Sequence, residues 1–236
     1  MPVNRYDDPA FFAAYAEMAR SREGLSGAGE WWQMKELFPD VQGKRVLDLG
    51  CGYGWHCRYA MEQGAESVLG LDQSRSMIDE AHRRNALPGI VYRVTDLRNY
   101  EYPPEQFDLV LSNLVLHYVA DLRQVYQKVW ETLKPGGTFL FNMEHPTFTA
   151  GVGQQFAPDG TWPVNDYYLP GKRETDFLGY RVTKEHHTLT QILMGLLDTG
   201  FRIRAVVEAM PPEEWREAMP WEMRRPMMLI VKAEKE

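Results

Sequence analysis

A glycine-rich turn directly after an apolar run is the part of this chain best suited to hold a ligand. The segment reads VLDLGCGYG over residues 46–54, and Gly50, Cys51 and Gly52 form its turn. Glycine accepts positive φ angles and lets the backbone approach a ligand closely. Asp48 precedes the first glycine by two residues, and its carboxylate would repel a pyrophosphate while favouring a ligand with cationic groups. The segment therefore predicts a binding loop for a positively charged small molecule.

A second carboxylate, Asp72, ends the next apolar run, in LGLDQS. In doubly wound nucleoside-binding proteins, a carboxylate at this place accepts the ribose hydroxyls, and it disfavours a 2′-phosphate. The alternative is that Asp72 only precedes a helix cap at Ser74. Beside Asp48 and the glycines, ribose binding is the favoured interpretation, with the adjacent Gln73 at the same edge.

The third apolar run also ends in a carboxylate, in the segment Val94-Thr95-Asp96-Leu97. Asp96 is placed to accept a hydrogen bond from an adenine amino group, and Leu97 and Met77 could sandwich the ring. The alternative is that Asp96 only starts a turn, a common use of aspartate. A nucleoside that also carries an ammonium and a sulfonium group would suit all three carboxylates, and S-adenosylmethionine has both groups.

Three of the six histidines stand near the expected active end and are candidate general bases. His117 follows the fourth run in NLVLHYV, His145 follows the fifth in MEHP beside Glu144, and His186 lies in KEHHTLT. The alternative for each is a structural histidine bonded to the backbone. Because catalytic residues gather at strand ends in such sheets, His145 gains weight. Glu144 and His145 lack the ligand spacing of a metal site, and no metal is expected.

These side chains need a scaffold that brings strand ends together. The pattern predicts strands at 45–49, 67–71, 90–94, 107–111, 138–141, 201–207 and 226–231, with helices at 53–63, 74–84, 122–133 and 188–197. Strands that are apolar on both faces and alternate with helices are typical of a parallel sheet covered on both sides. The fold class is therefore α/β, in one domain with a cofactor-binding core at 44–143.

Two segments flank or interrupt this core. Residues 1–43 contain two helical patterns, at 11–20 and 31–38, and are expected to form an N-terminal helical cap. Residues 144–187 are rich in Pro, Gly, Tyr and Trp, and a loop of this length is usually functional. We expect 144–187 to form a substrate lid, with an oligomer interface as the alternative, and 188–236 to form the C-terminal helix and strands.

Within the lid, two features are predicted. A hairpin could pair residues 167–169 with 179–182 across Pro170 and Gly171. His145 or His186 would face the transferred group from the two ends of the lid. Aromatic residues of the N-terminal helices and the lid flank the predicted opening and could line an apolar pocket, namely Trp31, Trp32, Trp162, Tyr167 and Tyr168. Ordinary packing is the alternative for most of them.

The ordered motifs VLDLGCGYG, LGLDQS, VTDLRNY, FDLVLSNLVLHYV and LKPGGTFLF resemble those of class I S-adenosylmethionine-dependent methyltransferases, in the small-molecule group called type 11 or type 12. The resemblance covers residues 44 to about 144 and implies a doubly wound, Rossmann-like sheet of seven strands. The last strand would be antiparallel and inserted between the fifth and sixth. It also implies methyl transfer from S-adenosylmethionine, with S-adenosylhomocysteine as product, to an O, N or C nucleophile of a small molecule.

The resemblance further implies roles for individual residues. Gly50 and Gly52 would contact the methionine end of the cofactor, Asp72 the ribose and Asp96 the adenine. Ser112 and Asn113, after the fourth strand, would lie near the transferred methyl group. In related methyltransferases the N-terminal segment folds over the cofactor, so Tyr15 and Arg20 are expected at the methionine end, where an arginine could pair with the carboxylate.

Two other functions are weighed against this one. An NAD-dependent oxidoreductase would need a third glycine at position 55, where the chain has Trp55. A non-catalytic module that binds S-adenosylmethionine is disfavoured because the glycine loop has lost none of its expected residues.

Composition excludes several further classes. The net charge of −7 gives no electrostatic footprint for nucleic acid. No apolar stretch approaches the roughly 20 residues that cross a bilayer, so no membrane partner is expected. Cys51 and Cys57 lack the CxxC spacing of zinc sites and are expected as thiols in a reducing cytosol. A cytoplasmic monomer or homodimer is therefore expected.

Overall fold

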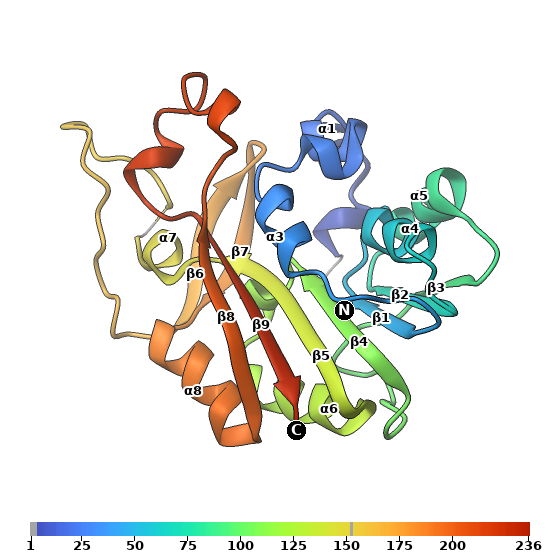
Figure 1. Cartoon of the computed structure of the whole chain (residues 1–236). Helices are drawn as coiled ribbons and strands as arrows, with labels where there is room; N and C mark the ends of the chain where they lie inside the picture. Colours follow the sequence, from blue (N-terminus) through green and yellow to red (C-terminus); the bar gives the residue numbers. More distant parts are fainter. Residues whose placement is uncertain (1–3, 152) are drawn as a thin grey trace.

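The fold is built on one seven-stranded sheet, seen in a computed structural model that describes residues 4–151 and 153–236. The strands are β1 (Arg45–Leu49), β2 (Ser67–Asp72), β3 (Ile90–Val94), β4 (Phe107–Asn113), β5 (Leu133–Glu144), β8 (Phe201–Ala209) and β9 (Met228–Lys235). Their order is β3-β2-β1-β4-β5-β9-β8 (Figure 1). β1 to β5 are parallel, and β9 runs antiparallel between β5 and β8. This confirms the predicted doubly wound, Rossmann-like α/β topology with its inserted last strand.

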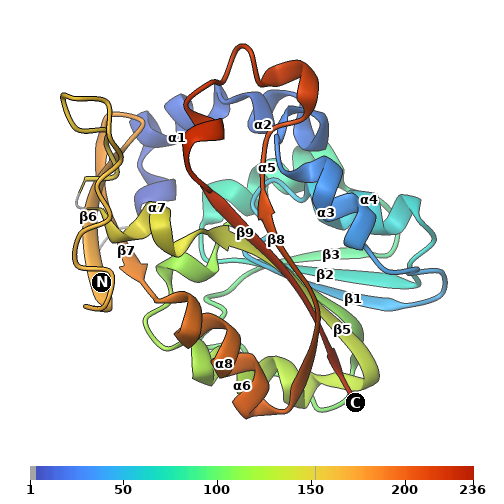
Figure 2. The same cartoon turned by 60° about the vertical axis from the view of Figure 1, so that its left-hand side comes forward.

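Helices cover both faces of this sheet. The α-helices are α1 (Pro9–Ala16), α2 (Ala19–Arg22), α3 (Trp31–Leu37), α4 (Trp55–Glu62), α5 (Arg75–Asn85), α6 (Leu122–Thr132), α7 (Pro146–Ala150) and α8 (Leu189–Thr199). Short 3₁₀ turns lie at Arg5–Asp7, Gly24–Gly27, Leu116–Tyr118, Glu213–Trp215 and Glu222–Arg224. Helices α3, α4 and α5 pack on one face, and α6 and α8 on the other (Figures 1 and 2). Among the described residues, no helix is long and apolar enough to cross a membrane.

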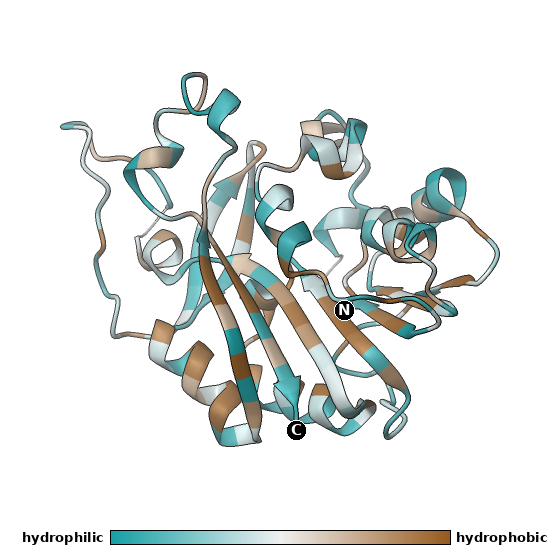
Figure 3. Ribbon diagram, viewed as in Figure 1, coloured by the Kyte–Doolittle hydropathy of each residue, from teal (hydrophilic) through white to brown (hydrophobic). Residues whose placement is uncertain are grey.

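The strands alternate their side chains between two apolar cores. In β4, Leu109 and Leu111 pack toward α4 and α5, whereas Val110 between them packs toward α6 and α8. β5 repeats the pattern with Leu140 on the first side and Phe139 and Phe141 on the second. Because successive strand residues point to opposite faces, a sheet covered on both sides must be apolar at every position. The central strands are accordingly hydrophobic in Figure 3.

Local sequence signals set the helix ends. The hydroxyl of Ser74 accepts the backbone N–H of Met77 and caps α5, as predicted. Thr188 and Gln191 form a reciprocal capping box at the start of α8, and Gly200 ends that helix with φ of +107°. The helix expected at 11–20 is instead two short helices, because the backbone is extended at Met18.

The segment between β5 and α8 differs most from expectation. It holds a short helix, α7, and a two-stranded hairpin of β6 (Gly171–Phe177) and β7 (Tyr180–His186). The predicted hairpin exists, but its predicted register across Pro170 and Gly171 is wrong. The turn is at Leu178 and Gly179, both with positive φ, the geometry that matches the twist of paired strands. Phe11 of α1 packs against Phe177 and Tyr180 of this hairpin, so the N-terminal segment and the hairpin close over the same end of the sheet.

Candidate active site

One cavity of about 370 Å³ lies at the carboxyl ends of the parallel strands. Its wall includes the glycine loop after β1, the ends of β2 and β3, the chain after β4 and the end of β5. The N-terminal segment and the β6–β7 hairpin supply the rest. In open α/β sheets the crevice beyond these strand ends is the usual ligand site, because the strand order reverses there, in this sheet between β1 and β4.

The glycine loop is fixed in place by backbone bonds. The N–H groups of Gly50 and Cys51 both donate to the carbonyl of Leu71, at 2.7 and 2.9 Å. Gly50 has φ of +75°, and a Cβ there would lie 2.2 Å from a methyl of Val115. Gly52 also has a positive φ, but a Cβ there would meet nothing within 4 Å. The loop therefore needs glycine at the first position for packing, and at the second it leaves open space on the cavity wall.

Asp72 is tied to the same loop. One carboxylate oxygen accepts the N–H of Gly52 at 3.0 Å, and the other accepts the N–H of Ser74 at 2.8 Å. Burial raises the pKa of this carboxyl to about 6. The carboxylate lines the cavity and each oxygen can accept a further bond, which suits a vicinal diol.

The end of β3 supplies the next part of the wall. Thr95, Asp96 and Leu97 line the cavity, as do Gln73 and Met77 from the end of β2 and α5. The carboxylate of Asp96 is clamped by the guanidinium of Arg98, which lowers its pKa and also lines the cavity. Asp96 thus meets the cavity as an ionised acceptor.

Two of the expected binding residues are not on the wall. Asp48 is buried behind the loop, where one oxygen accepts the thiol of Cys57 at 3.3 Å, and burial raises its pKa to about 7. Ser112 is also buried, and its hydroxyl donates to the carbonyl of Leu49, joining β4 to β1. Asn113, one residue later, lines the cavity and accepts from Asn142 at 2.8 Å. Side chains alternate along a strand, so Ser112 and Asn113 point to opposite faces of the sheet. Only Asn113 lines the cavity.

His145 and His186 do not line the cavity, which corrects the expectation that one of them faces it. The ring of His145 caps α7 by accepting the N–H of Thr147 at 3.0 Å, and its other nitrogen lies 3.1 Å from Glu208. His186 is fully buried, and its two ring nitrogens bond to Thr149 at 2.7 Å and to the carbonyl of Tyr167 at 2.9 Å. Both ring nitrogens of His186 and the Nδ1 of His145 therefore make structural hydrogen bonds.

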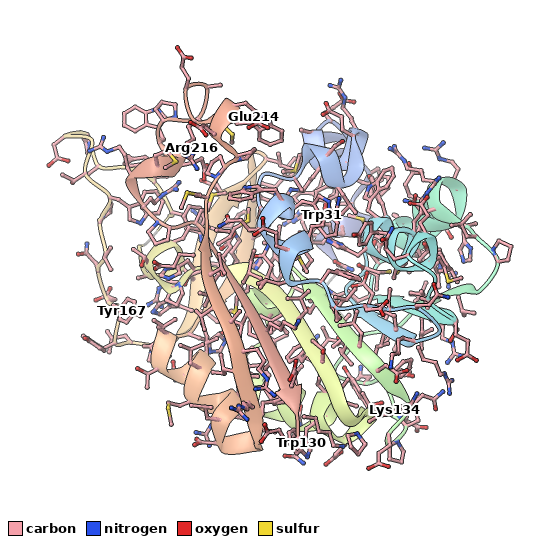
Figure 4. The ribbon with its side chains drawn as sticks, viewed as in Figure 1. Trp31, Trp130, Lys134, Tyr167, Glu214 and Arg216 are labelled. Atoms are coloured by element: carbon pink, nitrogen blue, oxygen red, sulfur yellow. The ribbon has the colours of Figure 1, made fainter. Side chains whose placement is uncertain are left out.

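The aromatic residues expected in the lid lie elsewhere as well. Tyr167 is beside the start of α8, where its hydroxyl accepts the N–H of Leu189 (Figure 4). Tyr168 is 86% exposed, and Trp162 stacks on Phe148. Of these four residues, only Phe148 lines the cavity, and no periodic pattern in the sequence indicates it.

His117, by contrast, lines the cavity together with a polar cluster that sequence reasoning missed. The ammonium of Lys184 lies 2.5 Å from one oxygen of Glu144 and 2.9 Å from the amide oxygen of Gln154. The amide nitrogen of Gln154 donates to the other oxygen of Glu144 at 2.8 Å. Glu144 also donates its backbone N–H to Nδ1 of His117 at 3.3 Å. The position of Glu144 at the end of β5 was a usable signal, but its partners come from 10 and 40 residues away.

The N-terminal segment completes the enclosure. Tyr6, Tyr15 and Arg20 line the cavity. The hydroxyls of Tyr6 and Tyr118 are 3.2 Å apart, and the guanidinium of Arg20 makes two bonds to Glu30 at 3.0 and 3.1 Å. Tyr15 and Arg20 therefore reach the cavity, whereas pairing of Arg20 with a ligand carboxylate stays a prediction.

Comparisons with known proteins agree with this geometry. A family described as a methyltransferase domain matches residues 47–141. A solved S-adenosylmethionine-dependent methyltransferase from Mesorhizobium loti is 41% identical, covers 90% of this chain and 100% of its own, and superposes with a TM-score of 0.84. A Listeria monocytogenes protein assigned to the same class is 42% identical over 90% of this chain and 99% of its own, with a TM-score of 0.85.

A curated relative matches a shorter part of the chain. The malonyl-[acyl-carrier protein] O-methyltransferase of Enterobacter lignolyticus is 39% identical over 97 residues, which is 41% of this chain. The match spans 38% of that relative's length. The aligned part is therefore less than half of either protein.

Proposed function

We propose that this chain, which belongs to the class I S-adenosylmethionine-dependent methyltransferases, moves the methyl group of its cofactor to a small-molecule acceptor held in the same cavity. The observation that carries the proposal is the continuity of the cavity. Its wall runs from Asp72 and Asp96 on one side to His117, Glu144 and Lys184 on the other. One enclosure can thus hold a nucleoside and a second small molecule side by side.

The first half of the cavity suits the cofactor. Asp72 would accept the ribose hydroxyls, and Asp96 the adenine amino group, with Leu97 and Met77 as apolar neighbours of the ring. The open space at Gly52 would let the methionine end approach the loop backbone. Arg20 would pair with the methionine carboxylate, and Asn113 would lie toward the reacting end.

In methyl transfer from this cofactor, the main task of the protein is to position the acceptor. When bound, S-adenosylmethionine supplies a methyl group on a positively charged sulfur that needs no further activation. The residues of this chain then have to hold the acceptor close and in line, and keep water out. A half-buried wall of Tyr118, Phe148 and Phe177, which line the same cavity as the polar cluster, serves both needs.

We further propose that residues 144–187 set acceptor specificity. The segment supplies Glu144, Phe148, Gln154, Phe177 and Lys184 to the wall, all on the side away from Asp96. Such segments commonly close over reactants. An interface between copies of the chain is the alternative, and Tyr168 is the exposed aromatic that would serve it.

An NAD-dependent oxidoreductase is the second candidate function, and the cavity disfavours it. Trp55 occupies the place of the third glycine in a dinucleotide fingerprint. Its ring lies on the cavity wall and packs where a Cβ on Gly24 would stand. A side chain at this position replaces the glycine that lets helix and strand pack closely around a pyrophosphate.

Thermal unfolding in the presence of each cofactor tests the proposed function, because a ligand stabilises the state that binds it. S-adenosylmethionine and S-adenosylhomocysteine should raise the Tm, and NAD should not. A rise with NAD and none with S-adenosylhomocysteine would overturn the proposal. Mass spectrometry of metabolite extracts incubated with labelled S-adenosylmethionine would then search for the acceptor.

A further inference from the structure

The acceptor half of the cavity has a carboxylate that is paired through both of its oxygens. Glu144 binds Lys184 through one oxygen and Gln154 through the other, at 2.5 and 2.8 Å. Burial alone would raise the pKa of Glu144, but the neighbouring His117 and Lys184 outweigh it, and its pKa lies below the ordinary value. Glu144 is therefore an ionised, paired group and a weak base toward a third molecule.

His117 is held as a neutral donor. Burial lowers its pKa to about 4, so the ring is uncharged at neutral pH. Its Nδ1 accepts the backbone N–H of Glu144 at 3.3 Å, which leaves the ring proton on Nε2. The ring lines the cavity, and the described residues provide no hydrogen bond to Nε2. The free side of His117 thus carries an N–H, whereas a general base would need a lone pair there.

Lys184 adds a charged donor. An ammonium has three N–H groups, and only two are used, toward Glu144 and Gln154. The side chain is 4% exposed and lines the cavity. Lys184 and the ring of His117 line the same cavity.

The pair of Tyr6 and Tyr118 provides a further hydrogen-bond donor. Tyr6 and Tyr118 share a single hydrogen bond at 3.2 Å between their hydroxyls, so one hydroxyl proton is left over. Burial raises the pKa of both phenols, and they stay protonated at neutral pH. The other cavity carboxylate on this side, Asp176, is exposed to solvent. Apart from Asp176 and the paired Glu144 and Gln154, the polar groups described on this half each offer a hydrogen-bond donor, namely His117, Lys184 and the pair of Tyr6 and Tyr118.

We propose that the acceptor is a carboxylic acid with an apolar body, bound as its anion between His117 and Lys184, with Phe148, Phe177 and Met227 around the body. The inference rests on the proposed function and names its substrate class. A carboxylate is ionised at neutral pH and needs no base, whereas an alcohol or an ammonium group would first have to lose a proton. A carboxylate oxygen forms the new bond to the methyl carbon, the carbon–sulfur bond breaks, and its electron pair stays on sulfur. The products are a methyl ester and neutral S-adenosylhomocysteine, so charge and atoms balance.

A matched set of probes tests the inference. Protein saturated with S-adenosylhomocysteine is titrated with phenylacetate, 2-phenylethanol and phenethylamine, which share a ring and differ in the polar group. Phenylacetate should bind at least tenfold more tightly than either of the others. Equal or tighter binding of the amine or the alcohol, or no binding of phenylacetate, would overturn the inference.

Three cavity variants and one control localise the effect. His117→Leu should lose most of the preference for phenylacetate, whereas His117→Gln, which keeps an N–H donor, should retain part of it. The double variant Glu144→Gln with Lys184→Met removes the ammonium without leaving a lone buried carboxylate, and it should abolish the preference. His82→Gln, at an exposed histidine away from the cavity, is the matched control. Preference unchanged in both the His117→Leu and the double variant would overturn the inference.

The cofactor titration distinguishes a wrong substrate class from a wrong proposed function. If S-adenosylhomocysteine binds and the acid preference is missing, only the substrate class is wrong. If S-adenosylhomocysteine does not raise the Tm, the proposed function fails and the inference falls with it.

Discussion

The carboxylate of Asp72 accepts the backbone N–H of Gly52 at 3.0 Å and thereby joins the end of β2 to the glycine loop after β1. Two sequence motifs that stand twenty residues apart become one surface through this bond. The same carboxylate caps the turn at Ser74. Ribose binding and loop geometry therefore depend on a single side chain.

Replacing Asp72 should consequently weaken the cofactor more than the fold. Asp72→Ala should lower the affinity for S-adenosylhomocysteine by about 1.5–3 kcal/mol, the range for a hydrogen bond to a charged group. Calorimetry measures the affinity, and Asp79→Ala on the exposed face of α5 serves as control. Unchanged affinity in the first variant would show that Asp72 acts only as a turn residue.

Substitutions at Gly50 and Gly52 should have different effects, the first on the stability of the fold and the second on cofactor affinity. Gly50→Ala places a Cβ against Val115 and should destabilise the fold, and Val115→Ala in the same chain should restore part of the loss. Gly52→Ala meets open space on the cavity side and should mainly lower affinity for S-adenosylhomocysteine. Urea unfolding and calorimetry on the three variants check both statements. The explanation fails if Gly52→Ala proves the more destabilising of the two single changes.

Asp48 should make the ligand-free protein less stable as pH rises. Burial raises its pKa from 3.8 to about 7, so the folded state holds the proton over a window where the unfolded state has lost it. Stability is then highest at the acidic side of this window and declines as pH approaches about 7. Each pKa unit corresponds to about 1.4 kcal/mol, which sets a ceiling of ~4 kcal/mol.

Asp48→Asn should therefore raise the free energy of unfolding at pH 8 and change it much less at pH 5. Urea unfolding at the two pH values measures the difference, and Asp79→Asn at an exposed site should show none. An equal effect of Asp48→Asn at both pH values would mean that charge burial is not the cause.

His186 should matter for stability and leave cofactor binding intact. His186→Ala removes bonds to Thr149 and to the carbonyl of Tyr167 at a fully buried site, and should cost about 2–4 kcal/mol. The affinity for S-adenosylhomocysteine should stay within twofold of the parent value, as should that of the exposed control His82→Ala. A stable variant with lost cofactor binding would return His186 to the candidate site.

Much of the fold follows from the sequence alone. The runs RVLDL at 45–49 and FDLVL at 107–111 place apolar residues on both faces, as a strand covered on both sides requires. The glycines after the first run and the aspartates after the second and third mark the ends of parallel strands, which meet at one edge of a sheet. Local signals of this kind predict elements and their order, and they placed Asp72, Asp96 and Gly52 on the cavity wall.

Only the tertiary structure decided the acceptor side. Glu144, Gln154 and Lys184 come together because β7 folds back beside the end of β5, and no local pattern encodes that approach. The same packing directs His145 and His186 to other contacts, because His145 caps α7 at Thr147 and His186 bonds to Thr149. Strand-end chemistry is set by short-range periodicity, whereas contacts across an irregular segment depend on how the whole chain packs.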